Sequence, residues 1–114
     1  MIKIKRVYDD YSKTDGYRIL VDRLWPRGAS KEKAKIDLWI KEITPSNDLR
    51  KWYHDNLEKG EQFQKKYLVE LEKNSDSLNE IKKTIENQKT ITLVSASKDP
   101  KPIHAVILQQ KFEN

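Results

Sequence analysis

Two arginines and an aspartate follow an apolar stretch in the segment RILVDRLWPRGAS, at residues 18–30. A guanidinium can bind a carboxylate or a phosphate through two parallel hydrogen bonds, so Arg23 and Arg27 are candidate anion ligands. The carboxylate of Asp22 can orient one of these arginines or act as a general base. The proline and glycine that follow indicate a turn, which would present these charges at the end of a strand.

A second polar cluster, SASKDPKPIH, lies near the C-terminus and ends in a histidine. The hydroxyls of Ser95 and Ser97 and the cation Lys98 precede a predicted helix, whose first backbone N–H groups are free to bind an anion. Together these groups predict an anion cradle, and Arg50 adds further positive charge. His104 falls in the first turn of that helix and is the candidate to transfer a proton.

Several of these residues also have an ordinary structural interpretation. Asp22 and Arg23 can form an ion pair that braces the turn, and His104 can be a hydrogen-bonded histidine without a role at the site. The sequence leaves both interpretations open for these three residues. His54 ends an amphipathic segment, where an imidazole interacts with the last helix carbonyls, so the structural interpretation is favoured.

The three tryptophans divide between packing and the site. Trp39 and Trp52 share predicted helix faces with isoleucine and leucine, which favours core packing over stacking on a ligand. Trp25 lies in the turn itself and is predicted to wall the crevice or to stack on an arginine.

Cysteine is absent from the 114 residues, which excludes disulfides, a thiolate nucleophile and a cysteine-based metal site. The two histidines lie far apart in the sequence, and no glycine-rich nucleotide loop, HExxH or GxSxG motif is present. We therefore predict no metal and no cofactor. We assign no reaction, because no activated nucleophile is visible.

The charges of the chain favour an anionic partner. A total of 23 lysines and arginines against 18 aspartates and glutamates gives a formal net charge of +5, which does not by itself select nucleic acid. The longest apolar run, residues 105–108, is far shorter than the roughly 18 residues of a membrane span. The N-terminal sequence MIKIK has no apolar signal segment, so we expect a bacterial-type cytoplasmic protein with no membrane contact.

The elements that must position these groups can be predicted from periodicity. Alternation at residues 2–7 indicates a half-exposed strand, and apolar runs at residues 17–22 and 90–96 indicate two buried strands. Helices are predicted at residues 30–44 with Ser30 as cap, from Ser46 with Leu49, Trp52 and Tyr53 on one face, around Phe63, Tyr67, Leu68 and Leu71, around Leu78, Ile81 and Ile85, and at residues 100–112.

This order of elements predicts an α/β fold. We expect a single domain over residues 1–114, with a small, mostly parallel sheet of about three or more strands flanked by helices. Ligands bind at the carboxyl ends of such strands, so both polar clusters share one crevice if the two buried strands are neighbours. Residues 8–16 form a short connection, so either the first strand is antiparallel to the next or this segment contains a tight helical turn.

Four segments carry a family resemblance: DGYRILVDRLWPRG, KEITPSNDLRKWYH, FQKKYLVEL and TLVSASKDPKPIHAVIL. Together they resemble the YeaO-like branch of the bacterial family named domain of unknown function 488, over nearly the whole chain. The resemblance implies an α/β fold with three signature segments. By similarity, the residues that match them are Asp22, Arg23, Trp25, Pro26, Arg27 and Gly28, then Pro45, Ser46, Leu49 and Arg50, and finally His104 and Ala105.

Two departures from that family limit the chemistry that the resemblance implies. Ile103 stands where family members commonly have asparagine before the histidine, so no role of an Asn-His pair carries over. Ser95, Ala96 and Ser97 stand where longer relatives often carry cysteine. Sulfur chemistry therefore does not carry over either.

These observations predict an anion-binding crevice at the carboxyl ends of the strands. One form of this function is an enzyme acting on a phosphate- or carboxylate-bearing small molecule, with His104 and Asp22 as catalytic residues. Arg23 and Arg27 would then hold the anion. The alternative is a nucleic-acid-binding or regulatory interaction module, which the acidic residues interspersed among the lysines do not favour.

Overall fold

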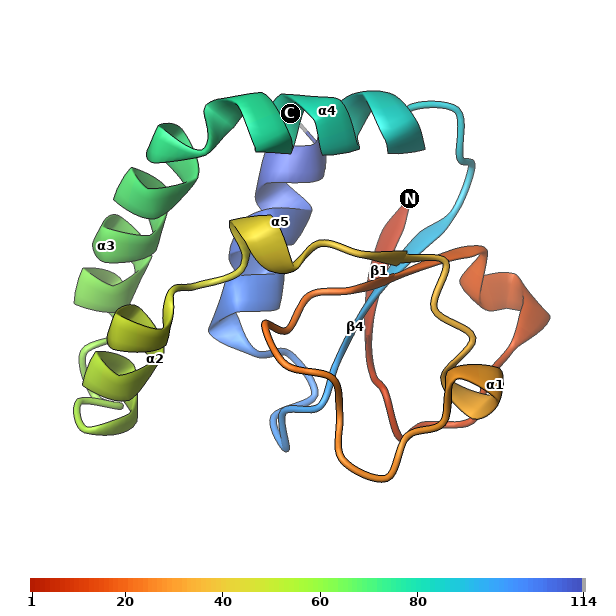
Figure 1. Ribbon diagram of the computed structural model, residues 1–114, viewed down its shortest axis with the longest axis horizontal. Coiled ribbons are helices and arrows are strands. Elements are labelled where there is room, and N and C mark those ends of the chain that lie inside the picture. Colours follow the sequence, from red (N-terminus) through yellow and green to blue (C-terminus); the bar gives the residue numbers. More distant parts are fainter. Residues whose placement is uncertain (114) are drawn as a thin grey trace.

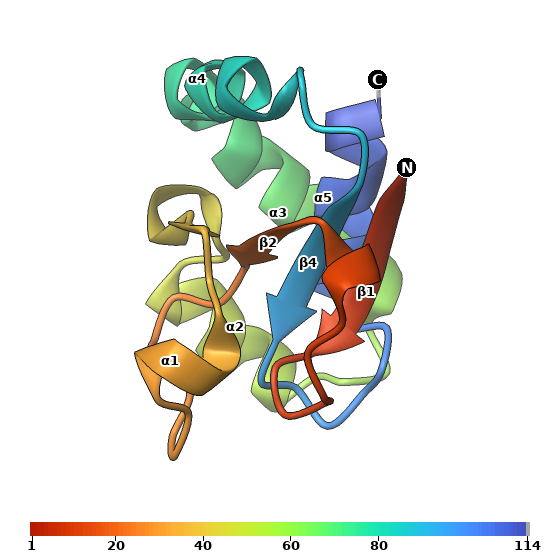
Figure 2. The same ribbon diagram turned by 90° about the vertical axis from the view of Figure 1, so that its right-hand side faces the viewer.

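The computed structural model of the protein describes residues 1–113 and contains a four-stranded sheet in the order β1-β4-β2-β3 (Figure 1). The strands are β1 (Ile2–Arg6), β2 (Tyr17–Leu20), β3 (Leu38–Trp39) and β4 (Ile91–Ser95). Each neighbouring pair is parallel, and Figure 2 shows the arrowheads of β1 and β4 pointing the same way. The predicted α/β fold with a small parallel sheet flanked by helices is confirmed.

The first strand is parallel to its neighbour, and the connection after it contains the tight helical turn. β1 pairs with β4, with Ile2 opposite Ile91. The 3-10 turn η1 (Lys13–Asp15) is capped by Ser12. Because β4 lies between β1 and β2, this short connection returns the chain to the start of the sheet on the far side of β4.

Helices lie in the other two connections between strands and after the last strand. They are α1 (Lys31–Ala34), α2 (Asn47–His54), α3 (Gly60–Lys73), α4 (Ser75–Ile85) and α5 (Ile103–Glu113), with a second 3-10 turn η2 (Lys41–Ile43). The helix predicted from Ser46 is confirmed as α2, because the Ser46 hydroxyl accepts the backbone N–H of Leu49 at 3.1 Å. The two predicted helices that follow it correspond to α3 and α4.

The last helix begins later than predicted, at Ile103 rather than at residue 100. Pro102 disfavours helical geometry at the residue before it. The backbone N–H of Lys101 donates instead to the carboxylate of Asp99 at 2.9 Å. The carbonyl of Pro102 then accepts the first hydrogen bonds of the helix.

The prediction of one helix over residues 30–44 is wrong. Ser30 does cap a helix, but α1 ends at Ala34, and the cap residue that follows, Lys35, has a left-handed φ of 47°. The chain then enters β3, where Trp39 lies opposite Leu20 of β2. The segment is therefore a short helix, a strand and the turn η2.

The apolar residues of this segment belong to two different cores, which explains the wrong prediction. Ile36 and Trp39 pack with one core, whereas Ile40 and Ile43 pack with the other. A spacing of three and four residues is typical of one helix face. The same spacing arises here because the chain sends side chains to both faces of the sheet in turn.

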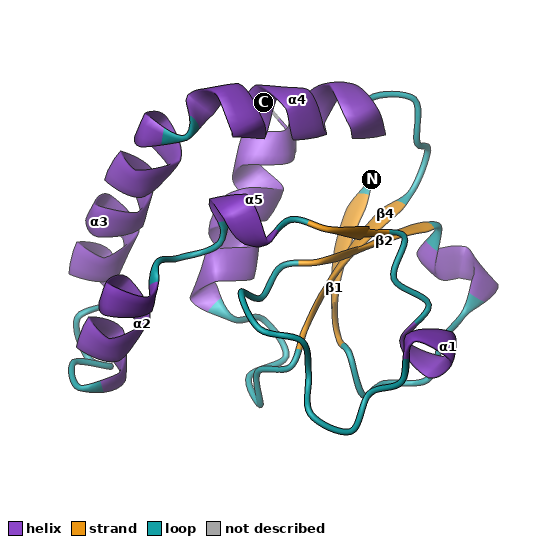
Figure 3. Cartoon of the chain, in the orientation of Figure 1, coloured by secondary structure: helices purple, strands orange, loops and turns teal. Residues whose placement is uncertain are grey.

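Side chains of the central strands alternate between these two cores. Ile19 and Leu93 face the larger core, to which α2, α3, α4 and α5 contribute. Leu20 and Val94 face the smaller core, which α1 and the segment after β2 cover. Helices α5 and α1 consequently lie on opposite sides of the sheet (Figure 3).

Gly16→Ala is expected to lower the free energy of unfolding by about 3 kcal/mol, through left-handed backbone strain and a backbone clash. Gly16 has a φ of +67°, and an added Cβ would lie 2.3 Å from the carbonyl oxygen of Thr90. Gly28→Ala is the matched control, because Gly28 has a φ of +73° but no atom within 4 Å of the added Cβ. It should cost about 1 kcal/mol. Urea unfolding measures both losses, and equal losses would contradict this account.

Candidate functional site

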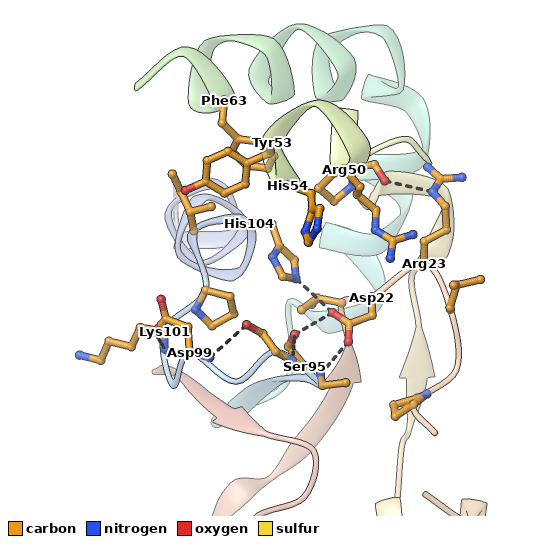
Figure 4. Close-up of a pocket in the computed structure, with 18 of the residues that line it drawn as sticks. Asp22, Arg23, Arg50, Tyr53, His54, Phe63, Ser95, Asp99, Lys101 and His104 are labelled. Atoms are coloured by element: carbon orange, nitrogen blue, oxygen red, sulfur yellow. Dashed lines mark hydrogen bonds and ion pairs between the residues drawn. The ribbon is translucent and has the colours of Figure 1, made fainter. Parts of the chain in front are cut away.

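The carboxylate of Asp22 joins three segments at the carboxyl-terminal edge of the sheet (Figure 4). Asp22 lies just beyond β2 and accepts a hydrogen bond from the hydroxyl of Ser95, the last residue of β4, at 2.7 Å. It also accepts the backbone N–H of Ala96 at 2.7 Å. Nε2 of His104, in the first turn of α5, lies 3.1 Å from Oδ1 of Asp22. The two polar clusters therefore meet, because β2 and β4 are neighbours in the sheet.

The surroundings of Asp22 favour its ionised form. Burial works to raise the pKa of Asp22, but the hydrogen bonds from His104, Ala96 and Ser95 outweigh it and hold the pKa below its ordinary value of 3.8. The side chain is only 19% exposed. A partly buried carboxylate with a lowered pKa and its oxygens already bonded is poorly suited to be a general base.

Aspartate, histidine and serine meet here, but not in the order that activates a serine nucleophile. In a serine triad the imidazole lies between the other two groups and takes the serine proton. In this protein the hydroxyl of Ser95 donates directly to Asp22, and Ser95 is only 2% exposed. No hydrogen bond joins Ser95 to His104 within residues 1–113. The arrangement holds the strand ends and α5 together.

Arg23 clamps the loop before α2. Its Nε donates to the carbonyl of Pro45 at 3.0 Å, and its Nη2 donates to the carbonyl of Thr44 at 3.0 Å. The ion pair between Asp22 and Arg23 that the sequence allowed is not formed. Arg23 does brace the turn, but through backbone carbonyls of a different segment.

A cavity of about 740 Å³ opens beside this cluster. The segment after β2, helix α2 and the segment that leads into α5 provide most of its wall. All of the predicted site residues except Lys98 line it: Asp22, Arg23, Trp25, Arg27, Arg50, Ser95, Ser97 and His104. Lys98 is exposed and lies outside the lining.

Trp25 lies in the wall of the cavity, where the sequence placed it. Its indole N–H donates to the carbonyl of Ala29 at 2.7 Å. Its ring meets the ring of Trp39 edge to face, with 5.5 Å between the centroids. Trp25 therefore packs on another tryptophan rather than on an arginine.

Arg27 and Arg50 also line the cavity, and both keep guanidinium donors that no other described group uses. Arg27 is exposed, and its side chain makes no hydrogen bond or ion pair with the described residues, while its backbone carbonyl accepts the hydroxyl of Tyr8 at 2.8 Å. Arg50 is also exposed and donates only to the side chain of Asn47, at 3.3 Å. Both guanidiniums can therefore bind a ligand without breaking a contact that the fold needs.

The predicted anion cradle at the start of α5 lacks most of its donors. Pro100 and Pro102 have no N–H group, and the N–H of Lys101 is bonded to Asp99. Asp99 also brings a carboxylate into the cavity wall. The hydroxyl of Ser97 accepts the N–H of Asp99 at 3.2 Å, which leaves its own proton available.

Several cavity residues lie outside the predicted site. Most of them are apolar or aromatic: Tyr8, Leu24, Tyr53, Leu57, Phe63, Pro102 and Ile103, together with Asp99 and Lys101. His54 also lines the cavity, although the sequence favoured a structural role for it. Helical spacing was the available signal, because Arg50, Tyr53 and His54 stand three and four positions apart on one face of α2.

Among residues 1–113, no three histidine, cysteine, aspartate or glutamate side chains gather in a way that could hold a metal ion. None of the helices in that range is long and apolar enough to cross a membrane.

Comparison with known proteins identifies the family. A family model described as "Inactive DUF488-N3 subclade" matches residues 1–114. The chain belongs to this family. The resemblance to the domain of unknown function 488 is thereby confirmed.

Bacterial relatives of this DUF488-N3 chain are similar over almost their full length. The chain is 42% identical to the uncharacterised protein YeaO of Escherichia coli K12 over 107 residues, which cover 94% of this chain and 92% of that protein. It is 37% identical to the uncharacterised protein Rv3073c of Mycobacterium tuberculosis H37Rv over 109 residues, which cover 96% and 91%. No solved structure matches the chain.

Asp22→Asn is expected to lower the free energy of unfolding of this DUF488-N3 chain by about 2 kcal/mol at neutral pH, because an amide cannot accept all three hydrogen bonds. The loss should depend on pH. The folded-state pKa of Asp22 lies below 3.8, so its contribution is full above that value and is lost as the pH falls through the lowered pKa. Urea unfolding of both proteins at several pH values measures the difference. A difference that does not narrow toward acid would contradict the role given to the charge.

Proposed function

We propose that this protein binds a small organic anion in the cavity and does not transform it chemically. The observation that carries the proposal is that the fold uses some charged side chains of the cavity as hydrogen-bond partners and leaves others available. Asp22 and Arg23 are bonded to the backbone of other segments, whereas the Arg27 side chain makes no hydrogen bond with the described residues and Arg50 donates only to the side chain of Asn47. A carboxylate or phosphate can accept such donors through two of its oxygens.

The other charges of the cavity support an anionic rather than a cationic ligand. Lys101 is in its wall with Arg27 and Arg50, and His54 adds a ring nitrogen. The carboxylate of Asp22 is occupied by its hydrogen bonds. The carboxylate of Asp99 accepts the backbone N–H of Lys101. The cavity therefore offers an incoming ligand more free donors and positive charge than free acceptors.

Binding without turnover is supported by the way the polar groups are used. Nε2 of His104 faces Asp22, and the hydroxyl of Ser95 donates to the same carboxylate. The two predicted catalytic residues, His104 and Asp22, are thus bonded to each other within the fold. The word "inactive" in the description of the family agrees with this interpretation.

A nucleic-acid-binding or regulatory interaction module is the alternative function. Lysines and glutamates are mixed along α3 and α4, which does not make the continuous basic face that a phosphate backbone requires. The free guanidiniums also line a cavity and not an outer stripe. The alternative function would show itself as binding of nucleic acid that weakens steeply with added salt.

Arg27→Gln and Arg50→Gln should each weaken the binding of methyl phosphate about tenfold, since the loss of a charge-assisted hydrogen bond costs about 1.4 kcal/mol or more. Both side chains are exposed, so the stability of each variant should equal that of the parent protein. Lys98→Gln removes the same charge outside the cavity and is the matched control. An NMR chemical-shift titration at low salt measures the three affinities.

The three variants separate a cavity site from a general effect of charge. Equal weakening in all three would mean that methyl phosphate responds to net charge alone, which contradicts the proposal. A parent protein that shows no saturable shifts at cavity residues would contradict it too. Tighter, steeply salt-dependent binding of a short single-stranded oligonucleotide would favour the alternative function.

A further inference from the structure

The cavity has an apolar side as well as a cationic one. Figure 4 draws Tyr53 and Phe63 on one side and Arg50 on the other, with His104 between them. We propose that the ligand is an anion that carries a flat apolar group, of the class of aryl phosphates and aryl carboxylates. This inference rests on the proposed function and names the class of its ligand.

Three helices build the apolar side. The rings of Tyr53 on α2 and Phe63 on α3 lie 4.4 Å apart between centroids, with 33° between their planes. A Cβ added to Gly60 would lie 3.6 Å from Cδ1 of Ile103 and 3.8 Å from the hydroxyl of Tyr53, so the start of α5 closes against the same point. Phe63 is 2% exposed and forms the floor, while Tyr53 and Ile103 are half-buried walls.

Two exposed leucines add apolar surface to the lining of the cavity. Leu57 is 65% exposed and Leu24 is 63% exposed, and both line the cavity. Single exposed leucines are ordinary on protein surfaces. Here, however, they line the same cavity as a partly buried aromatic wall, so an apolar ligand group that reaches them would remove surface of both the ligand and the leucines from water.

The size of the cavity also fits a ligand larger than an inorganic anion. Its volume of about 740 Å³ lies within the roughly 300–1,000 Å³ that is usual for small-molecule sites. A bare phosphate bound by Arg27 and Arg50 would leave the side around Tyr53 filled with water. A ring attached to the anion would displace that water and could stack or pack edge-on against the aromatic wall.

Phenyl phosphate and methyl phosphate test this inference, because they carry the same anion and differ in the apolar group. Phenyl phosphate should bind the parent protein about tenfold more tightly in the same NMR titration. Leu57→Ser should reduce this preference about threefold and leave the affinity for methyl phosphate unchanged. Val69→Ser is the matched control, since Val69 is 49% exposed on α3 and does not line the cavity. It should change neither affinity.

Tyr53→Ala is the stronger variant and should abolish the preference, with circular dichroism to verify that its helices are intact. Equal affinities for the two phosphates in the parent, with Arg50→Gln still weakening both, would overturn the inference and leave the proposed function standing. If neither phosphate binds, both fail. A preference that survives Leu57→Ser and Tyr53→Ala alike would put the ring elsewhere and also overturn the inference.

Discussion

The hydrogen bonds to the carboxylate of Asp22 are the interaction on which the whole crevice depends. Parallel strands end at one edge of a sheet, so the residues at the ends of β2 and β4 meet there, and one partly buried carboxylate holds them to α5. The indole N–H of Trp39 donates to the backbone carbonyl of Asp22 at 2.7 Å, and this hydrogen bond connects β3 to the same edge. Nε of Arg6 donates to the carbonyl of Ser97 at 3.0 Å, and this hydrogen bond connects the end of β1 to the segment after β4. Every strand is therefore tied to this edge.

Arg23, the next residue in the chain, fixes the position of the cavity wall that α2 forms. Arg23 holds the loop before α2 by two backbone carbonyls, and α2 then presents Arg50 to the cavity. The protein thus uses one carboxylate and one guanidinium to build the crevice and keeps other guanidiniums free within it. This division explains how a cluster with the composition of a catalytic site can have a structural role, while exposed arginines in the same cavity are left for the binding role proposed above.

Much of the fold and part of the site follow from the sequence. The buried strands and the helix capped by Ser46 were predictable because run length, period and capping agree locally, and the meeting of Asp22 with His104 follows from the geometry of parallel strands. The structure of residues 30–44 was not predictable, because apolar residues spaced three and four positions apart fit both a helix face and a chain that alternates between two cores. The role of Arg23 was also not predictable, because its partners are backbone carbonyls. Every residue has a backbone carbonyl, so the sequence does not indicate which ones Arg23 contacts.

The most direct test of the central claim is the ionisation of Asp22 in the folded protein. A carbon NMR titration of the side-chain carboxyl groups measures its pKa, with the resonance assigned by its absence from the spectrum of Asp22→Asn. The account predicts a pKa below the ordinary value of 3.8, because hydrogen bonds from α5 and the end of β4 stabilise the carboxylate. A pKa at or above that value would contradict the claim that this charged group holds the crevice together.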